Sequence, residues 1–122
     1  MIPLDNAHTL STLVRYQFGD FEVMPIPTSH DGVNNCGYIF KTDTDTLVYI
    51  TDTGYIKKDY IKYIKNATYY IIESNYDKEM LFNSTRPTFL KRRINGRKGH
   101  LSNIQSALYL SKLIGTRTKK VM

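Results

Sequence analysis

Residues 46–73, TLVYITDTGYIKKDYIKYIKNATYYIIE, decide the fold of this chain. The first six residues form an apolar run that predicts a strand, and Gly54 ends it. Residues 67–73 are again apolar and aromatic, as is typical of a buried strand. Between the runs, residues 55–64 place apolar side chains at helical spacing, which predicts an amphipathic helix. A strand, helix and strand in this order predict a parallel pair joined by a crossover.

The regions on either side complete an α/β fold. Two strand pairs are predicted upstream, over residues 12–18 and 21–27 and over residues 37–42 and 46–51, each joined by a tight turn. Downstream we expect two short helices over residues 78–82 and 90–94, a longer helix over 102–113, and the start of another strand at 119–122. The sequence therefore predicts one domain over residues 1–122, a mixed sheet with helices packed on one face.

Composition limits the classes of protein to consider. The chain has 122 residues, 41% of them hydrophobic, which suffices for one core. It has neither an apolar stretch of membrane-spanning length nor a signal-peptide pattern, so we expect a cytoplasmic protein without membrane contact. The single cysteine, Cys36, excludes an internal disulfide and a cysteine-only zinc site.

Charge is distributed unevenly along the chain. The net charge is +6, and all eleven acidic residues lie at or before Glu79. The basic last third is typical either of a surface that attracts phosphate backbones or of a solvated face with a basic tail. Under the first interpretation the nucleic-acid contacts are Lys91, Arg92, Arg93, Arg97 and Lys98.

Two polar residues follow predicted strands and could carry chemistry. His30 comes after the strand at residues 21–27, and a loop imidazole is a common metal donor. Asp52 ends the strand at residues 46–51, where a carboxylate can bridge two cations. Each also has an ordinary interpretation, His30 as a surface or capping residue and Asp52 as a helix N-cap.

Two further clusters have the same character. Residues 73–77, Glu-Ser-Asn-Tyr-Asp, follow the buried strand, and residues 99–103, Gly-His-Leu-Ser-Asn, precede the last helix. His100 is placed where a histidine could act as a general acid. Capping by Ser102 or Asn103 is the ordinary alternative.

Together and in this order, four motifs resemble the metallo-β-lactamase-fold exonucleases of the YycJ (WalJ) type. The motifs are His-Asp-x(5)-Gly-Tyr from His30, Thr-Asp-Thr-Gly from Thr51, Glu-Ser-Asn-x-Asp-x-x-Met-Leu from Glu73 and Gly-His-Leu-Ser-Asn from Gly99. The similarity extends from about Phe21 to the C-terminus and implies a partial αββα-type fold.

The resemblance assigns chemical roles to three residues. It implies that His30 and Asp52 are metal ligands, that His100 helps to protonate the leaving group, and that the cofactor is a divalent metal, zinc or manganese. In a complete enzyme of this kind, two ions hold a hydroxide and the scissile phosphate.

The sequence also departs from the family pattern. The main metal motif, His-x-His-x-Asp-His, is absent, since the only histidines are His8, His30 and His100, and the family's last metal histidine would follow the strand that begins near Val121. Tyr76 replaces a usual histidine, and Asn34 and Asn35 replace Glu-Pro. We therefore expect a chain that lacks the N-terminal metal-motif region and the C-terminal end of the fold.

Two functions remain open at this point. The chain is either part of a metal-dependent DNA nuclease, inactive or metal-free alone and completed by another polypeptide, or a non-catalytic domain that binds nucleic acid or protein on the same scaffold. In both cases an uncovered sheet face or edge predicts association with itself or with a complementing chain.

Overall fold

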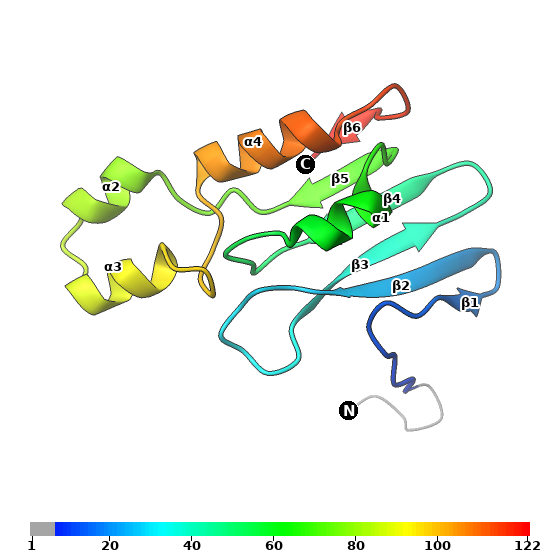
Figure 1. The fold of residues 1–122 in the computed structure, drawn as a ribbon, viewed down its shortest axis with the longest axis horizontal. Helices are drawn as coiled ribbons and strands as arrows, with labels where there is room; N and C mark the ends of the chain where they lie inside the picture. Colours follow the sequence, from blue (N-terminus) through cyan, green and yellow to red (C-terminus); the bar gives the residue numbers. More distant parts are fainter. Residues whose placement is uncertain (1–6) are drawn as a thin grey trace.

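The computed structural model describes residues 7–122 and contains one six-stranded mixed sheet (Figure 1). The strands are β1 (Tyr16–Phe18), β2 (Phe21–Pro27), β3 (Cys36–Lys41), β4 (Thr46–Ile50), β5 (Tyr69–Ile72) and β6 (Lys120–Val121), and they lie in sequence order across the sheet. Strands β1, β2, β3 and β4 pair in an antiparallel manner, each with the next along the chain. The pairs β4–β5 and β5–β6 are parallel. The predicted crossover and the predicted last strand are thereby confirmed.

The helices divide into two groups. The first group, α1 (Ile61–Ile64) and α4 (Asn103–Leu113), covers one face of the sheet. The second group, α2 (Lys78–Asn83) and α3 (Thr88–Ile94), lies beyond the end of the sheet toward which β4 and β5 run (Figure 1). None of the helices in residues 7–122 is long and apolar enough to cross a membrane.

The core lies between the sheet and the first group of helices. Val48 and Tyr70 are fully buried, and they pack with Ile64 of α1 and Leu113 of α4. The Tyr70 hydroxyl donates to the carbonyl oxygen of Ile64 at 2.7 Å and accepts from the Ala67 amide, which satisfies its polar atom inside the core. Burial raises the pKa of this phenol.

The crossover helix is shorter than the sequence predicts. A helix was expected over residues 55–64, but a 3-10 turn at Lys58–Tyr60 and the single turn of α1 are all that form. Lys57 is extended, and the backbone amide of Ile56 instead donates to the Tyr109 hydroxyl of α4 at 3.1 Å. Tertiary contact with α4 therefore overrides the helical periodicity of this segment.

The other face of the sheet points away from the helices. Strand alternation places Tyr38, Tyr49 and Ile71 on it in register, and Tyr49 is 38% exposed. This apolar face agrees with the expectation of an uncovered surface, and association through it stays a prediction.

Candidate metal centre

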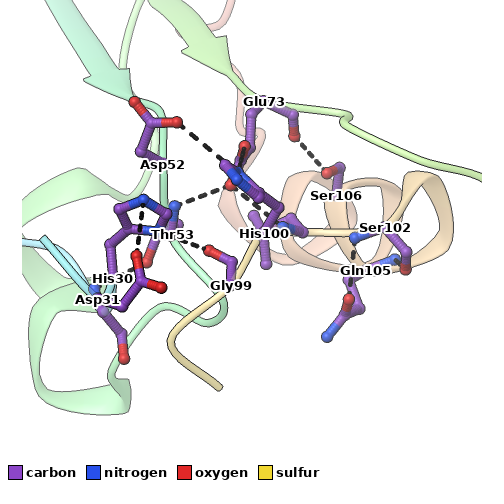
Figure 2. A network of polar contacts seen from close by, with 12 residues as sticks. His30, Asp31, Asp52, Thr53, Glu73, Gly99, His100, Ser102, Gln105 and Ser106 are labelled. Atoms are coloured by element: carbon purple, nitrogen blue, oxygen red, sulfur yellow. Dashed lines mark hydrogen bonds and ion pairs between the residues drawn. The ribbon is translucent and has the colours of Figure 1, made fainter. Parts of the chain in front are cut away.

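Three residues that are far apart in sequence meet at one end of the sheet (Figure 2). His30 follows β2, Asp52 follows β4, and His100 precedes α4. One ligand atom from each lies within 4.8 Å of the others, and the two imidazole centroids are 5.0 Å apart. The site residues predicted from the sequence are thus brought together.

Glu73, at the end of β5, holds this end of the sheet together. Its Oε1 accepts from the amides of Thr53 at 2.8 Å and Leu101 at 3.1 Å, and its Oε2 lies 2.9 Å from Nδ1 of His100. The carboxylate is 8% exposed. Because a carboxylate beside a histidine fixes the ring and its tautomer, Nδ1 of His100 carries the hydrogen and Nε2 presents its lone pair.

His30 is oriented by a backbone carbonyl. Its Nδ1 lies 3.0 Å from the carbonyl oxygen of Gly99. Since a carbonyl only accepts, Nδ1 donates, and the Nε2 of the neutral ring has a lone pair available. Nε2 also lies 3.4 Å from Oδ1 of Asp31. Nδ1 of each histidine is thus engaged by the protein, and Nε2 of His30 lies beside the Asp31 carboxylate.

Asp52 has an unusual backbone conformation. Its φ is +50°, in the left-handed region that aspartate tolerates better than most residues. Its side chain is 62% exposed, and Oδ1 lies 3.7 Å from Nδ1 of His100, beyond hydrogen-bond distance. The carboxylate is therefore presented at the surface of the site and is not consumed as an N-cap.

Thr53 and Gly54 fix the loop that carries Asp52. The Thr53 hydroxyl accepts from the amide of Ser29 at 3.0 Å and donates to the carbonyl of Tyr55 at 2.8 Å. The amide of Gly54 donates to the Ser29 carbonyl at 2.7 Å. A Cβ at Gly54 would overlap the carbonyl group of Arg97, so only glycine lets the two loops approach this closely.

His100 is positioned by the start of α4. Ser102 caps the helix with a capping box, in which its hydroxyl accepts from the Gln105 amide and the Gln105 side chain accepts from the Ser102 amide (Figure 2). The Ser106 hydroxyl donates to the main-chain carbonyl of Glu73. The capping predicted for Ser102 is thus present, and His100 lies in the same segment beside the candidate centre.

The basic residues predicted to contact nucleic acid have different surroundings. Arg93 donates from Nε to Oδ2 of Asp31, and Lys91 donates to the Phe82 carbonyl at 2.8 Å. Arg97 lies 4.5 Å above the Tyr55 ring, and Lys98 lines a hollow that His30 also borders. Arg92 is the fifth of these cations. Among the five, only Arg93 lines the hollow that both imidazoles also line.

The donor set fits a divalent cation. Two imidazoles and a carboxylate are ligands that zinc and related ions take, and catalytic zinc commonly uses three protein ligands. Ligand atoms that bind one tetrahedral ion lie about 3.4 Å from one another. The three ligand atoms here lie within 4.8 Å of one another, so a small movement would bring them onto one ion. The Glu73 contact to His100 supplies the outer carboxylate that metal-bound histidines usually have.

Sequence reasoning did not place Glu73 in the site. It treated residues 73–77 as a polar cluster with capping as the alternative, and the structure supports capping only for Asp77, whose side chain accepts from the Met80 amide. The position of Glu73 directly after a buried strand was the available signal. A carboxylate that is buried there must find hydrogen-bond donors, because burial of an unpaired charge is costly.

The fold and the site define a class: an α/β protein with a histidine and aspartate cluster at the carboxyl ends of its strands. The model of the β-lactamase superfamily domain matches residues 2–122, and the chain belongs to this family.

Named relatives refine this assignment. The chain is 38% identical over 104 residues to exodeoxyribonuclease WalJ of Streptococcus pneumoniae, covering 85% of this chain and 39% of the relative. It is 37% identical over 120 residues to exodeoxyribonuclease YycJ of Bacillus anthracis, covering 98% of this chain and 46% of the relative. The chain therefore spans less than half the length of these relatives.

Solved structures agree on the fold. The metallo-β-lactamase fold protein YhfI from Bacillus subtilis aligns with a TM-score of 0.60 at 19% identity, covering 83% of this chain and 36% of the other. Zinc-bound PqqB from Methylobacterium extorquens aligns with a TM-score of 0.58 at 15% identity, covering 93% of this chain and 37% of PqqB. The resemblance to the metallo-β-lactamase fold and the α/β fold class predicted from the sequence are confirmed.

Proposed function

We propose that this chain forms part of a metal-dependent phosphodiesterase centre that acts on DNA. The observation that carries the proposal is the convergence of His30, Asp52 and His100 within 4.8 Å. Support for the substrate comes from two relatives named as exodeoxyribonucleases. The roles given to the three residues below are part of the proposal.

His30 and Asp52 would hold the metal. His30 is suited to this because Gly99 occupies Nδ1 and leaves Nε2 available, and Asp52 because its carboxylate is exposed beside both rings. When bound, zinc or manganese would polarise the phosphate and generate a nucleophile from water.

His100 would handle a proton at Nε2. Glu73 accepts from Nδ1–H at 2.9 Å, which fixes the ring and leaves Nε2 for proton transfer. Protonated Nε2 could donate to a leaving oxygen. With His100 in this role, two ligands remain, fewer than the three that a catalytic zinc usually has. We therefore propose that the chain is inactive alone and that another chain, or a second copy, completes the centre.

The test combines metal binding with activity. Equilibrium dialysis against Zn²⁺ and Mn²⁺ should detect an ion whose retention is lost in His30→Ala and Asp52→Asn. His100→Ala should retain most of the metal if the residue moves a proton, and should lose it if the residue is a third ligand. DNA cleavage should require addition of a chain that carries His-x-His-x-Asp-His. Absence of both metal retention and cleavage in that mixture would refute the proposal.

A second candidate function is nucleic-acid binding without catalysis. The observation that favours it is the run of cations in α3 and the loop that follows, beside the candidate centre. This function predicts DNA binding in the presence of a chelator, with affinity falling steeply as salt rises. Lack of any retardation at low salt would exclude it.

A further inference from the structure

A hollow of about 160 Å³ opens beside the candidate metal centre. His30 and His100 line one side of it, and α3 contributes Leu90, Arg93 and Ile94 to the other. Arg93 thus brings a permanent positive charge to the same space as the two imidazoles. An anion that enters the hollow meets these three side chains and also the Asp31 carboxylate that lines it.

Arg93 is held in one orientation by Asp31. Its Nε donates to Oδ2, while Oδ1 of the same carboxylate faces His30 at 3.4 Å. Of the five N–H groups of a guanidinium, only the one on Nε has a partner among residues 7–122. The two terminal amino groups remain for a ligand. A planar fork of this kind matches the oxygens of a phosphate group.

Two of the neighbouring cations, Lys91 and Arg97, are engaged elsewhere. Lys91 is bonded to the Phe82 carbonyl and connects α3 to α2, and Arg97 is stacked on Tyr55. The basic residues therefore differ in position, and among the five cations Arg93 is the one that lines the hollow with both imidazoles.

We propose that Arg93 binds a phosphate group in this hollow and that Asp31 is the positioning residue that orients its guanidinium. This inference rests on the proposed function, because it specifies the group that the centre takes from its substrate. An internal phosphate of a DNA strand, a terminal phosphate and inorganic phosphate share this chemistry, and the test separates them.

The primary test is a phosphate titration of the full chain in the presence of a chelator, followed through the backbone amide signals of Gly99 and His100. Loss of two charge-assisted hydrogen bonds in Arg93→Ala should weaken binding by about a hundredfold. Arg93→Lys keeps the charge without the fork and should restore only part of the affinity. Arg86→Ala removes the same charge from an exposed position outside the hollow and should bind as the wild type does. Equal affinity in Arg93→Ala and Arg86→Ala would overturn the inference.

Asp31→Ala separates orientation from charge. This variant removes a negative charge beside the hollow, so a purely electrostatic role for Arg93 predicts tighter binding. We expect weaker binding, because the guanidinium loses the partner that orients it. Asp43→Ala makes the same charge change in the β3–β4 turn and provides the control. Tighter binding by Asp31→Ala than by Asp43→Ala would overturn the positioning role.

Short single-stranded DNA with and without a terminal phosphate identifies the source of the ligand. If Arg93→Ala loses the same affinity for both DNAs, the ligand is an internal phosphate. If it loses affinity only for the phosphorylated DNA, the ligand is a terminal phosphate. A loss seen with inorganic phosphate but with neither DNA would overturn the inference. Because the chelator removes metal from these titrations, failure of the metal-centre proposal would not remove the signal. If zinc binding is intact but Arg93→Ala binds phosphate and DNA as the wild type does, this inference alone is overturned.

Discussion

The two ends of the sheet both gather polar groups, but they use them differently. At the end opposite the candidate centre, Lys119 lies 3.2 Å from Asp45, and the Thr68 hydroxyl accepts from the Thr46 amide. At the candidate centre, donors converge on Glu73, while the ligand atoms of His30 and Asp52 lie within 4.8 Å of each other. One end pairs its charges in a simple surface contact, and the other gathers two imidazoles and an exposed carboxylate, as the proposed metal centre requires.

The largest expected effect comes from removing the buried carboxylate of Glu73. Glu73→Ala leaves the amides of Thr53 and Leu101 without their acceptor, and we expect the free energy of unfolding to fall by roughly 3 kcal/mol. Urea unfolding measures this loss. Asp45→Ala at the opposite end should cost less, because its carboxylate is partly exposed. An equal loss at both ends would remove the distinction between them.

Metal should stabilise one end only. At a free zinc concentration one hundred times the dissociation constant, we expect the free energy of unfolding to rise by about 2.7 kcal/mol. Thermal unfolding with zinc and then with excess chelator tests the rise and its reversal. Asp45→Asn should retain the effect, whereas His30→Ala should abolish it. Equal stabilisation of His30→Ala and the wild type would place the ion elsewhere.

A methyl group at Gly54 should disturb the candidate centre. It would overlap the Arg97 carbonyl, so the loops must separate, and we expect a loss of roughly 2 kcal/mol in unfolding experiments. Zinc affinity should fall in the same variant because Asp52 moves with the loop. Gly19→Asn, in the β1–β2 turn at the other end, provides the control, since its surroundings are open and asparagine tolerates a positive φ. Unchanged zinc affinity in Gly54→Ala would contradict the coupling.

The smallest expected effect is on the stability of the protein at acidic pH. Hydrogen bonding from Thr44, together with Lys119, lowers the pKa of Asp45 below its ordinary value of 3.8. Stabilisation by this carboxylate is therefore fully present above that value and is lost as the pH falls through the lower folded-state pKa. The stability difference between wild type and Asp45→Asn should be constant near neutral pH and should shrink below pH 3.8. A difference that grew on acidification would show that the pairing does not favour the charged form.

Much of the fold could be predicted because its signals are local. Alternating and continuous apolar runs located β2 to β5, and the crossover between β4 and β5 followed from their order. The length of α1 could not be predicted, because the hydrogen bond from Ile56 to Tyr109 depends on a helix that begins more than forty residues later. Periodicity carries no information about such a partner.

The three residues of the candidate centre could be predicted from the sequence, whereas the contacts that support them could not. His30, Asp52 and His100 each follow or precede an element in a way that the sequence reveals. The burial of Glu73 and the pairing of Asp31 with Arg93 arise only when distant segments meet. The different surroundings of the basic residues could not be predicted either, because these residues have the same charge and differ only in position.

The left-handed backbone of Asp52 also limits which sequences can evolve at this position. A selection for folding alone should accept aspartate, asparagine and glycine at residue 52 and reject β-branched residues, since only the former tolerate a φ of +50°. A selection for the proposed chemistry should keep aspartate alone. Comparing the residues that survive the two selections would separate the demand of the chain's geometry from that of its chemistry at one position.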